Sequence, residues 1–350
     1  MKNFFKVLGL LLLLVVVAAA GLIAYLTVTE YRPSAREAAP MPSVSVDPQP
    51  FSGNTLTILT FNTGYAGLGD NADFFMDGGK EVRATDESRV RENMQEITSI
   101  IETTGADFTL LQEVDLDSTR TYGIDQITEY FLETGLNASY ALNYSCAYVP
   151  YPLPPIGRVN SGIETLTNFE MAEAERISLP CPFSWPVSAA NLKRCLLLTR
   201  TPVAGTDKEL VIVNLHLEAY DDGAGKLEQT QALLSVLEEE YEKGNYVIAG
   251  GDFNQTFPGS LEAYPIQNAE KWTPGVLEES ALAEGWQFAC DTSAPTCRLL
   301  DAPYTAGETQ CYVIDGFILS PNISLTAVKT LDNQFRASDH NPVLLTAALQ

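Results

Sequence analysis

The chain has 350 residues, of which 45% are apolar, and its formal net charge is −24. This length and composition allow a substantial buried core, enough for one large domain or two small ones. The acidic surplus weighs against broad, sequence-independent binding to DNA, because such binding depends on lysines and arginines that neutralise phosphates. It does not exclude nucleic acid as a substrate, since a bound metal ion supplies positive charge locally.

The first thirty residues form a segment apart from the rest. Lys2 and Lys6 precede an uncharged, almost wholly apolar run over residues 7–28, which matches the roughly 20 residues that a helix needs to cross a bilayer. Basic residues before the run and few after it favour a cytoplasmic N-terminus. We interpret residues 1–30 as an uncleaved membrane anchor, with the rest of the protein outside the cytoplasm.

A cleaved signal peptide is the alternative for this segment. Ala18, Ala19 and Ala20 resemble a small-residue cleavage site. The apolar run is longer than the usual signal-peptide core of about 7–15 residues, which favours the anchor. Cleavage would make the protein a secreted one, whereas an intact anchor binds it to the membrane through its N-terminal helix.

Residues 31–53 contain five prolines among serine, alanine and charged residues. Such a composition predicts a stiff, extended, Pro-rich linker that cannot bury a core of its own. The linker is either a tether that holds the following domain clear of the membrane surface or a disordered leader.

Residues 54–350 alternate between strand-like and helix-like segments. Hydrophobic patterning predicts strands at residues 56–61, 108–111, 161–167, 192–199, 210–217, 245–250, 312–319, 323–330 and 343–347, and helices at 88–102, 124–134 and 226–241. Residues 70–86 are predicted to be a long loop, and residues 145–187, rich in proline and aromatics, to be loops around one short strand. Because strands outnumber helices and several are consecutive, we expect one α/β domain with mixed sheets.

Six cysteines, at positions 146, 181, 195, 290, 297 and 311, lie in this domain. An even number in an exported domain allows up to three disulfides, although the sequence does not determine their pairing. Cys290 and Cys297 are close enough to close a small loop. Buried free thiols are the alternative, and a zinc site is not expected because no histidine lies near a cysteine at ligand spacing.

Eight polar residues stand out because most of them end apolar, strand-like runs. They are Asn62 in Leu-Thr-Phe-Asn, Glu113 in Leu-Gln-Glu-Val, His216 in Asn-Leu-His-Leu, Asp252 and Asn254 in Gly-Gly-Asp-Phe-Asn, Asp315 in Val-Ile-Asp-Gly-Phe, and Asp339 and His340 in Ser-Asp-His-Asn-Pro. His216 and His340 are the two histidines of the chain. Carboxylates, amides and imidazoles in such a set are what a divalent metal and a phosphate ester require.

Hydrolysis of a phosphate ester needs a metal ion, a base for the attacking water, and donors for the developing charge. Glu113 offers the hard oxygen ligand that Mg²⁺ prefers, and Asn62 and Asp339 can complete the surroundings of the ion. Asp315, which apolar residues flank, can hold His340 by a carboxylate–imidazole hydrogen bond. Each residue alone also has an ordinary explanation as a turn or strand-end residue, so the prediction depends on the whole ordered set.

This ordered set resembles the endonuclease/exonuclease/phosphatase superfamily, which includes deoxyribonuclease I, exonuclease III, sphingomyelinases and inositol polyphosphate phosphatases. The resemblance covers residues 54–350 and depends most on Gly-Asp-Phe-Asn together with Ser-Asp-His. It implies a four-layer α/β sandwich of two packed mixed β-sheets with flanking helices, here preceded by one N-terminal transmembrane helix. Features of particular subfamilies are absent or loose, so the resemblance does not assign one.

The resemblance also implies a role for each residue. Glu113 binds the metal, with Asn62 and Asp339 beside it, and Asp315 and His340 form the base dyad. His216 and Asn254 contact the phosphate or the leaving group, and Asp252 orients the nucleophile or handles a proton. Which residue is the general base stays open at this point.

We therefore expect a membrane-tethered, extracytoplasmic phosphoesterase that depends on Mg²⁺ or Mn²⁺ and hydrolyses phosphodiesters. Acidity and the nearby membrane favour a lipid headgroup or small phosphoester over nucleic acid. An extracellular nuclease of the same fold is one alternative, and a non-catalytic surface binding protein that retains the fold is another. No protein partner is implied.

Two further groups of side chains are candidates for substrate contacts. Arg120, Lys193 and Arg194 either lie near the substrate phosphate or are solvated surface charges. Tyr148, Tyr151 and Trp185 either line a cleft for a headgroup or base, or pack under the long loops.

Overall fold

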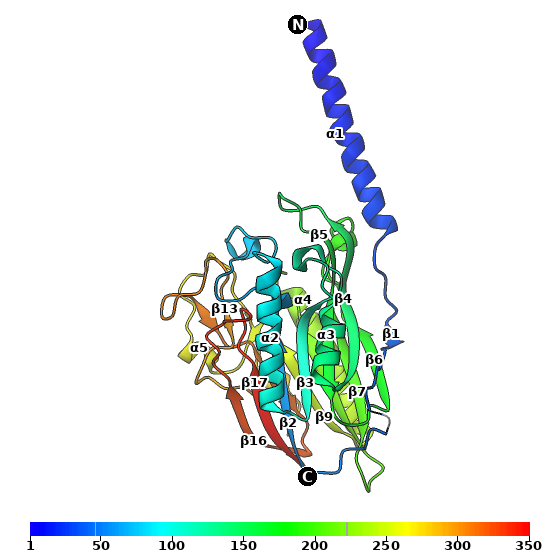
Figure 1. Ribbon diagram of the computed structural model, residues 1–350, viewed down its shortest axis with the longest axis vertical. Coiled ribbons are helices and arrows are strands. Elements are labelled where there is room, and N and C mark those ends of the chain that lie inside the picture. The colour runs from blue at the N-terminus through cyan, green and yellow to red at the C-terminus, as the bar shows by residue number, and fades with distance from the viewer. Residues whose placement is uncertain (46, 222) are drawn as a thin grey trace.

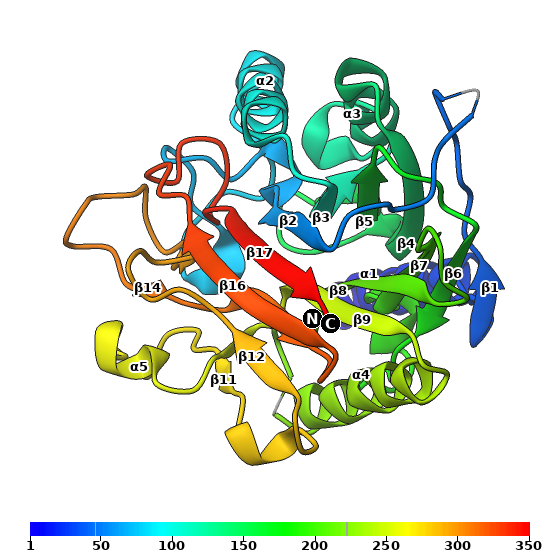
Figure 2. The same cartoon turned by 90° about the horizontal axis from the view of Figure 1, so that it is seen from below.

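Two β-sheets pack face to face in the computed structural model, which describes residues 1–45, 47–221 and 223–350 (Figures 1 and 2). The six-stranded sheet has the order β16 (Ile323–Thr330), β17 (Val343–Leu349), β2 (Thr55–Asn62), β3 (Phe108–Asp115), β5 (Gly157–Thr167) and β4 (Asn137–Val149). The seven-stranded sheet has the order β1 (Arg36–Ala38), β6 (Glu173–Ser178), β7 (Cys195–Pro202), β8 (Glu209–His216), β9 (Tyr246–Asp252), β15 (Asp315–Leu319) and β12 (Gln287–Ala289).

Helices form the two outer layers. Helices α2 (Glu87–Thr104) and α3 (Gln126–Thr134) cover the six-stranded sheet, and α4 (Ala224–Glu242) covers the other sheet, as Figure 2 shows. Among the described residues, short elements lie in the connections: β10 (Gln255–Thr256), α5 (Ser260–Ala263), β11 (Gly275–Val276), β13 (Cys297–Arg298), β14 (Cys311–Tyr312) and five 3₁₀ turns. The predicted four-layer sandwich of two mixed sheets is thereby confirmed.

The apolar core follows these layers. Ile58 and Leu110 of one sheet pack against Ile212 and Ile248 of the other, while separate clusters join each sheet to its helices. Central strands are therefore buried on both faces, which explains why they appear in the sequence as nearly continuous apolar runs.

Strand direction brings several chain segments to one edge of the sandwich. Strand β2 pairs with β3 in parallel, and β8 pairs with β9 in parallel, whereas the other pairs within the two sheets are antiparallel. These four strands end at Asn62, Asp115, His216 and Asp252. The polar residues singled out in the sequence therefore meet at this edge.

The expectation of loops around one short strand over residues 145–187 was wrong. This region carries the end of β4, all of β5 and all of β6. Strand β4 buries small or polar residues such as Ser139, Ala141 and Asn143, so it lacks the apolar alternation that marks a strand in the sequence. Pairing with β5, rather than local propensity, makes it a strand.

The Pro-rich segment lies along the domain instead of standing free. Strand β1 pairs with β6 at the edge of the seven-stranded sheet, and the amide of Ala138 donates to the carbonyl of Pro42 at 3.0 Å. Phe51 is buried in the core between the sheets. The predicted domain start at residue 54 therefore leaves out β1 and Phe51, because an edge strand recruited by backbone bonds needs no apolar pattern of its own.

Helix α1 (Lys2–Val28) extends away from the domain, as Figure 1 shows. Within its residues Asn3–Val28, an 18-residue window has a mean hydropathy of 3.0, so this helix is long and apolar enough to cross a membrane or to act as a signal sequence. All six cysteines are free thiols in the structure. The structure therefore has free thiols rather than disulfides, but of the six only Cys146, Cys195 and Cys297 are buried.

Candidate active site

One row across three neighbouring strands carries three of the candidate residues. In the parallel pair β8–β9, His216 lies opposite Asp252, and in the antiparallel pair β9–β15, Asp252 lies opposite Asp315. Side chains at paired positions project to the same face of a sheet. Strand register alone therefore places an imidazole and two carboxylates side by side.

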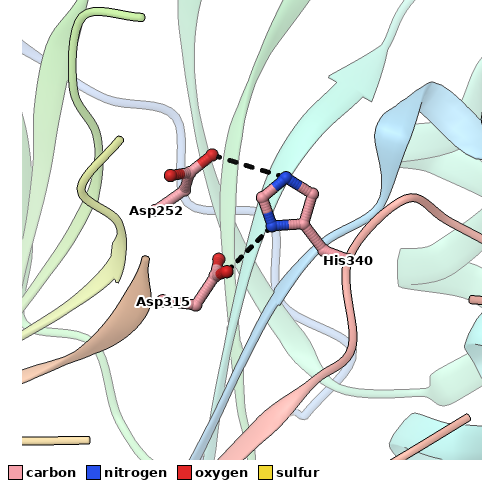
Figure 3. Close-up of side chains that lie close together, drawn as sticks. All are labelled: Asp252, Asp315 and His340. Carbon is pink, nitrogen blue, oxygen red and sulfur yellow. Dashed lines mark hydrogen bonds and ion pairs between the residues drawn. The ribbon is translucent and has the colours of Figure 1, made fainter. Parts of the chain in front are cut away.

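His340 reaches this row from the loop before β17. Its Nδ1 lies 2.8 Å from Oδ2 of Asp315, and its Nε2 lies 3.7 Å from Oδ2 of Asp252 (Figure 3). The same oxygen of Asp252 lies 3.4 Å from Nε2 of His216. His340 is thus held by one carboxylate and directed at a second, with all four side chains almost wholly buried.

Two hydroxyl groups that sequence reasoning missed hold the backbone at His340 and at Asp315. Ser338 Oγ donates to the carbonyl oxygen of Asn62 at 2.7 Å and accepts from the amide of His340 at 3.2 Å. Thr296 Oγ1 accepts from the amide of Asp315 at 3.1 Å. Ser338 was visible in the Ser-Asp-His run, whereas nothing local to Thr296 marks it.

The six-stranded sheet contributes Asn62 and Glu113. The Asn62 amide donates to Glu113 Oε1 at 3.2 Å and to Asp252 Oδ2 at 3.0 Å, and it lies 3.4 Å from His340 Nε2. Asn62 therefore links the metal-ligand candidates of one sheet to the row of the other.

Glu113 sits at a break in its strand. Its φ of 53° lies in the left-handed region, and the pairing of β3 with β5 shifts register between Leu111 and Val114. A bulge of this kind re-aims a side chain, and strained non-glycine backbone often marks functional sites. The bulge leaves Glu113 partly exposed at the site while its neighbours remain buried.

Asp339 lies beside the loop that follows β2. At Gly64, with a φ of 50°, an added Cβ would come within 2.6 Å of Asp339 Oδ1, so glycine is needed there both for conformation and for space. Asp339 Oδ2 lies 4.0 Å from His340 Nε2. The structure thus brings Asp339 next to the other candidates.

An amide pair below the site ties the two sheets together. Gln112 Nε2 donates to Asn214 Oδ1 at 2.8 Å, and Asn214 Nδ2 donates to the carbonyls of Leu111 and Glu164 at 3.1 and 2.9 Å. Buried amides that satisfy one another in this way define a unique packing of the sheets. Both precede candidate residues in the sequence, yet only the packing reveals their role.

Burial raises the pKa of two carboxyl groups. Desolvation, and then the negative charge of Asp315, raise the pKa of Asp252 to about 7. Desolvation and the charge of Glu113 likewise raise the pKa of Asp339 to about 6, against the opposing charge of His340. A cation placed among these groups would favour their charged forms.

The two histidines shift in opposite directions. Burial alone would lower the pKa of His340, but the charge and hydrogen bond of Asp315 outweigh it and raise that pKa well above its usual value. Burial lowers the pKa of His216 well below its usual value, and the charge of Arg194 adds to this shift. His216 is therefore neutral at pH 7.

The donor set fits a divalent cation. Ligand atoms of Asp252, Asp315 and His340 lie within 4.8 Å of one another, but His340 and Asp315 already bond to each other. Within the described residues, neither Glu113 nor Asp339 forms an ion pair with a lysine or arginine. These two carboxylates with the Asn62 amide make the better hard-oxygen set.

The remaining candidates lie in different surroundings. Asn254, with a φ of 51°, donates from Nδ2 to the carbonyl of Leu217 at 2.9 Å and from its backbone amide to Asp252 Oδ1 at 2.8 Å. It lies at the site and joins the ends of β8 and β9. Arg194 adjoins the site from behind, because it donates to the carbonyl of His216 at 3.2 Å.

Arg120 and Lys193 are committed elsewhere. Arg120 forms two hydrogen bonds with Asp115, at 2.8 and 3.0 Å, and stacks over the Tyr65 ring at 3.7 Å. Lys193 pairs with Glu30 at 2.9 Å beside the end of α1. Neither residue is the solvated surface charge that was the alternative, and neither has a free head for a phosphate.

Tyr148, Tyr151 and Trp185 were expected to line a cleft or to pack under loops. Their exposed fractions are 38%, 69% and 62%. The edge of the Tyr151 ring meets Phe75, with ring centroids 5.7 Å apart. All three aromatic residues thus retain a large solvent-exposed area, which packing under loops would have removed.

Comparison with solved structures agrees with this fold. An endonuclease/exonuclease/phosphatase from Beutenbergia cavernae superposes with a TM-score of 0.56 at 17% identity, covering 85% of this chain and 72% of that one. ANGEL2, a 2′,3′-cyclic phosphatase, gives a TM-score of 0.56 at 16% identity over 89% and 99% of the two chains. A functionally unknown protein from Enterococcus faecalis gives 0.55 at 16% over 84% and 100%.

At these identities the structures establish the fold alone, and no curated protein matches the sequence significantly. The family assignment comes from a family model that matches residues 59–340, a span that includes all eight candidate residues. Members of this family are hydrolases of phosphoester bonds and generally depend on a divalent metal. The chain belongs to the endonuclease/exonuclease/phosphatase family.

Proposed function

We propose that this protein is a membrane-tethered, extracytoplasmic hydrolase of phosphodiesters that depends on Mg²⁺ or Mn²⁺. The observation that carries this proposal is the bonded pair of Asp315 and His340, set 3.7 Å from Asp252 and beside the carboxylates of Glu113 and Asp339, with which no lysine or arginine of the described residues pairs. A base held by a carboxylate next to a cation site is what the attack of water on phosphorus requires.

Asp315 acts on His340 through Nδ1. Its carboxylate fixes the orientation of the ring, makes Nδ1 the protonated nitrogen when the ring is neutral, and raises the basicity of Nε2. Nε2 then lies 3.7 Å from Oδ2 of Asp252 and 3.4 Å from the amide nitrogen of Asn62. Nε2 of the neutral ring is therefore the atom that accepts the proton of the attacking water.

Glu113, Asn62 and Asp339 would hold the metal ion. When bound, the ion neutralises charge on the phosphoryl oxygens and helps to orient the ester. Oδ2 of Asp252 lies near Nε2 of both histidines. Because the pKa of Asp252 is about 7, this residue is the second candidate for accepting or donating a proton. The neutral ring of His216 and the amide of Asn254 contact the phosphate or the leaving group.

The substrate favoured by the chain is a lipid or small phosphoester. An acidic protein that carries an N-terminal apolar helix is better suited to a headgroup than to a long polyanion. An extracellular nuclease of the same fold is the rival. A non-catalytic binding protein should lack part of the chemical set, whereas this chain retains all eight residues.

A metal-dependence assay tests the proposed function. We expect the full-length protein in detergent to hydrolyse bis(4-nitrophenyl) phosphate with added Mg²⁺ or Mn²⁺, and EDTA to abolish the activity. The His340→Ala variant is the matched control for contaminating enzymes. Full activity in a metal-stripped sample would overturn the mechanism. Panels of DNA, RNA, nucleotides, sphingomyelin and phosphatidylinositol then identify the substrate.

N-terminal sequencing of the mature protein tests the tether. An intact N-terminus in the membrane fraction supports an anchor at residues 1–30. A mature chain that starts at Gly21 would instead establish a secreted enzyme.

A further inference from the structure

The end of helix α1 is packed against the domain. Leu26 is buried against Cys146 of β4 and Ala189, and Leu22 packs on the same cluster. The indole nitrogen of Trp185 donates to Thr27 Oγ1 at 3.0 Å. The last two turns of the helix therefore run beside the β4 end and the segment before β7, and the domain is not suspended on a free linker.

The position of these contacts sets the depth of the domain relative to a membrane. The apolar run of residues 7–28 would be about 33 Å long as a helix, close to the roughly 30 Å of a hydrocarbon core. Leu22 lies about 9 Å before the end of that run. Domain segments in contact with Leu22 and Leu26 would therefore lie at the boundary between acyl chains and headgroups.

These segments lie at the edge of the sandwich that carries the active site. In the antiparallel pair β3–β5, Asp115 lies opposite Ser161, so the loop of residues 150–156 before β5 projects beyond the carboxyl end of β3. In the pair β7–β8, Leu196 lies opposite Leu215, so the segment before β7 projects beyond His216. Figure 1 shows the β4–β5 loop and α1 at the same end of the domain, with the C-terminus at the opposite end.

Exposed apolar side chains gather on these projecting segments. We use the name apolar rim for Met76, Tyr148, Tyr151, Leu153, Trp185 and Val187, which are 38% to 89% exposed. The loop with Met76 joins the others, because Phe75 packs edge-on against Tyr151 and Val82 packs with Ile156. Tyrosine and tryptophan favour the headgroup level of a bilayer, where the ring is buried and its polar atom stays wet.

We propose that the apolar rim docks on the outer leaflet of the membrane that holds α1, and that the active site takes the phosphodiester headgroup of a lipid in that leaflet. This inference rests on the proposed phosphodiesterase function and names its substrate class. Water adds to the lipid phosphorus, one P–O ester bond breaks, and the departing alcohol takes a proton, which leaves a phosphomonoester. Apolar contact carries the docking, since a protein with a net charge of −24 gains nothing from an anionic surface.

Fluorescence quenching tests the docking independently of catalysis. The full-length protein is reconstituted in phosphatidylcholine vesicles with or without acyl-chain bromination, which quenches a tryptophan that reaches the lipid. We expect quenching in the wild type and its near-complete loss in Trp185→Phe, because Trp272 and Trp286 lie outside the rim. Equal quenching in both proteins, or none in either, would overturn the docking face.

Hydrolysis by a rim variant tests the lipid substrate. Membrane affinity scales with buried apolar area, so we expect Tyr151→Asp/Leu153→Asp to lower hydrolysis of sphingomyelin and phosphatidylinositol in the vesicles at least about tenfold and that of bis(4-nitrophenyl) phosphate by less than about twofold. Leu132→Asp is the matched control, since Leu132 is 65% exposed on α3 and lies outside the rim. It should change neither rate.

The outcomes separate this inference from the proposed function. Equal loss on the soluble and the lipid substrates, or no loss on either, would overturn the rim as a determinant of lipid hydrolysis. A wild type that hydrolyses the soluble diester but neither lipid would overturn the lipid substrate while the phosphodiesterase function stands. A wild type that hydrolyses no diester would overturn the proposed function, and the quenching result would still report the docking.

Discussion

His340 and His216 approach the same oxygen of Asp252, with Nε2 at 3.7 and 3.4 Å respectively, but different groups lie behind the two rings. Nδ1 of His340 bonds to Asp315 at 2.8 Å. Nδ1 of His216 is buried without a partner in the described part of the chain, and the nearby charge is the guanidinium of Arg194.

This difference shows that the surroundings of Nδ1, the ring nitrogen that does not face Asp252, determine the role of each histidine. A carboxylate at Nδ1 favours the imidazolium form and makes His340 a stronger base. Burial and a neighbouring cation keep His216 neutral, so it donates or accepts a hydrogen bond without changing charge. One carboxylate thus lies between a ring whose pKa is raised and a ring whose pKa is lowered.

The largest effect is expected from breaking the His340 side of the comparison. His340→Ala and Asp315→Ala should each lower the phosphodiesterase rate by about 10²–10⁴, the range for positioned acid–base groups. The double variant should lose little more than either single variant, because the two residues act as a unit. Steady-state rates of the four proteins at saturating metal measure this coupling.

Asp315→Asn is the sharpest variant of this pair, because it keeps the shape and removes the charge. We expect the pKa of His340 to fall, which moves the acid limb of the pH–rate profile to lower pH while the maximal rate drops. Near-native activity with an unmoved acid limb would show that the dyad assignment is wrong. Asp252 would then be the better candidate for the base.

A smaller effect is expected on the His216 side. His216→Ala should slow the reaction by about 10²-fold, the low end of the range for such groups, because a hydrogen bond to the phosphate or leaving group is lost. The acid limb of the pH–rate profile should stay in place, since His340 and Asp315 are untouched. If the acid limb shifts in His216→Ala, the two histidines titrate as one coupled system. The proposed difference between their roles would then be wrong.

The smallest effect concerns the free energy of unfolding of the protein in EDTA. The two histidines should contribute to this free energy with opposite pH dependences. The folded pKa of His340 is raised, so its contribution is fully present below the unfolded value of 6.5 and is lost as the pH rises through the folded pKa. The folded pKa of His216 is lowered, so its contribution is lost as the pH falls below 6.5. Each slope is at most about 1.4 kcal/mol per pH unit.

Denaturant unfolding of the wild type and of His216→Gln between pH 5 and 7 measures the His216 part of this prediction. We expect the difference in free energy of unfolding to move in favour of the variant as the pH falls, because glutamine has no proton to gain in the unfolded state. A difference that does not change with pH would mean that the folded protein protonates His216 as readily as the unfolded chain does.

Most elements of the sandwich could be predicted because their patterns are local. The strand that ends at Asn62 and the helix of residues 88–102 have the expected bounds within one or two residues. Strands β4 and β6 could not be found, since β4 carries polar residues on its buried side and β6 is mixed with charges. In α4, Leu227 is 58% exposed while Leu233 and Leu237 are buried, so the apolar residues of the helix do not by themselves define its inward face.

The sequence by itself determined which chemical groups are available and in what order. Strand-end carboxylates, amides and two histidines were readable because each motif is a short local run, and the family model spans them all. Only the tertiary structure decided that His216, Asp252 and Asp315 share one row, since pairing register is a property of three strands at once. It also decided that Glu113 sits at a bulge and that the rings carry opposite pKa shifts. Burial and the charges of neighbours far along the chain set such shifts, and no local run of residues contains them.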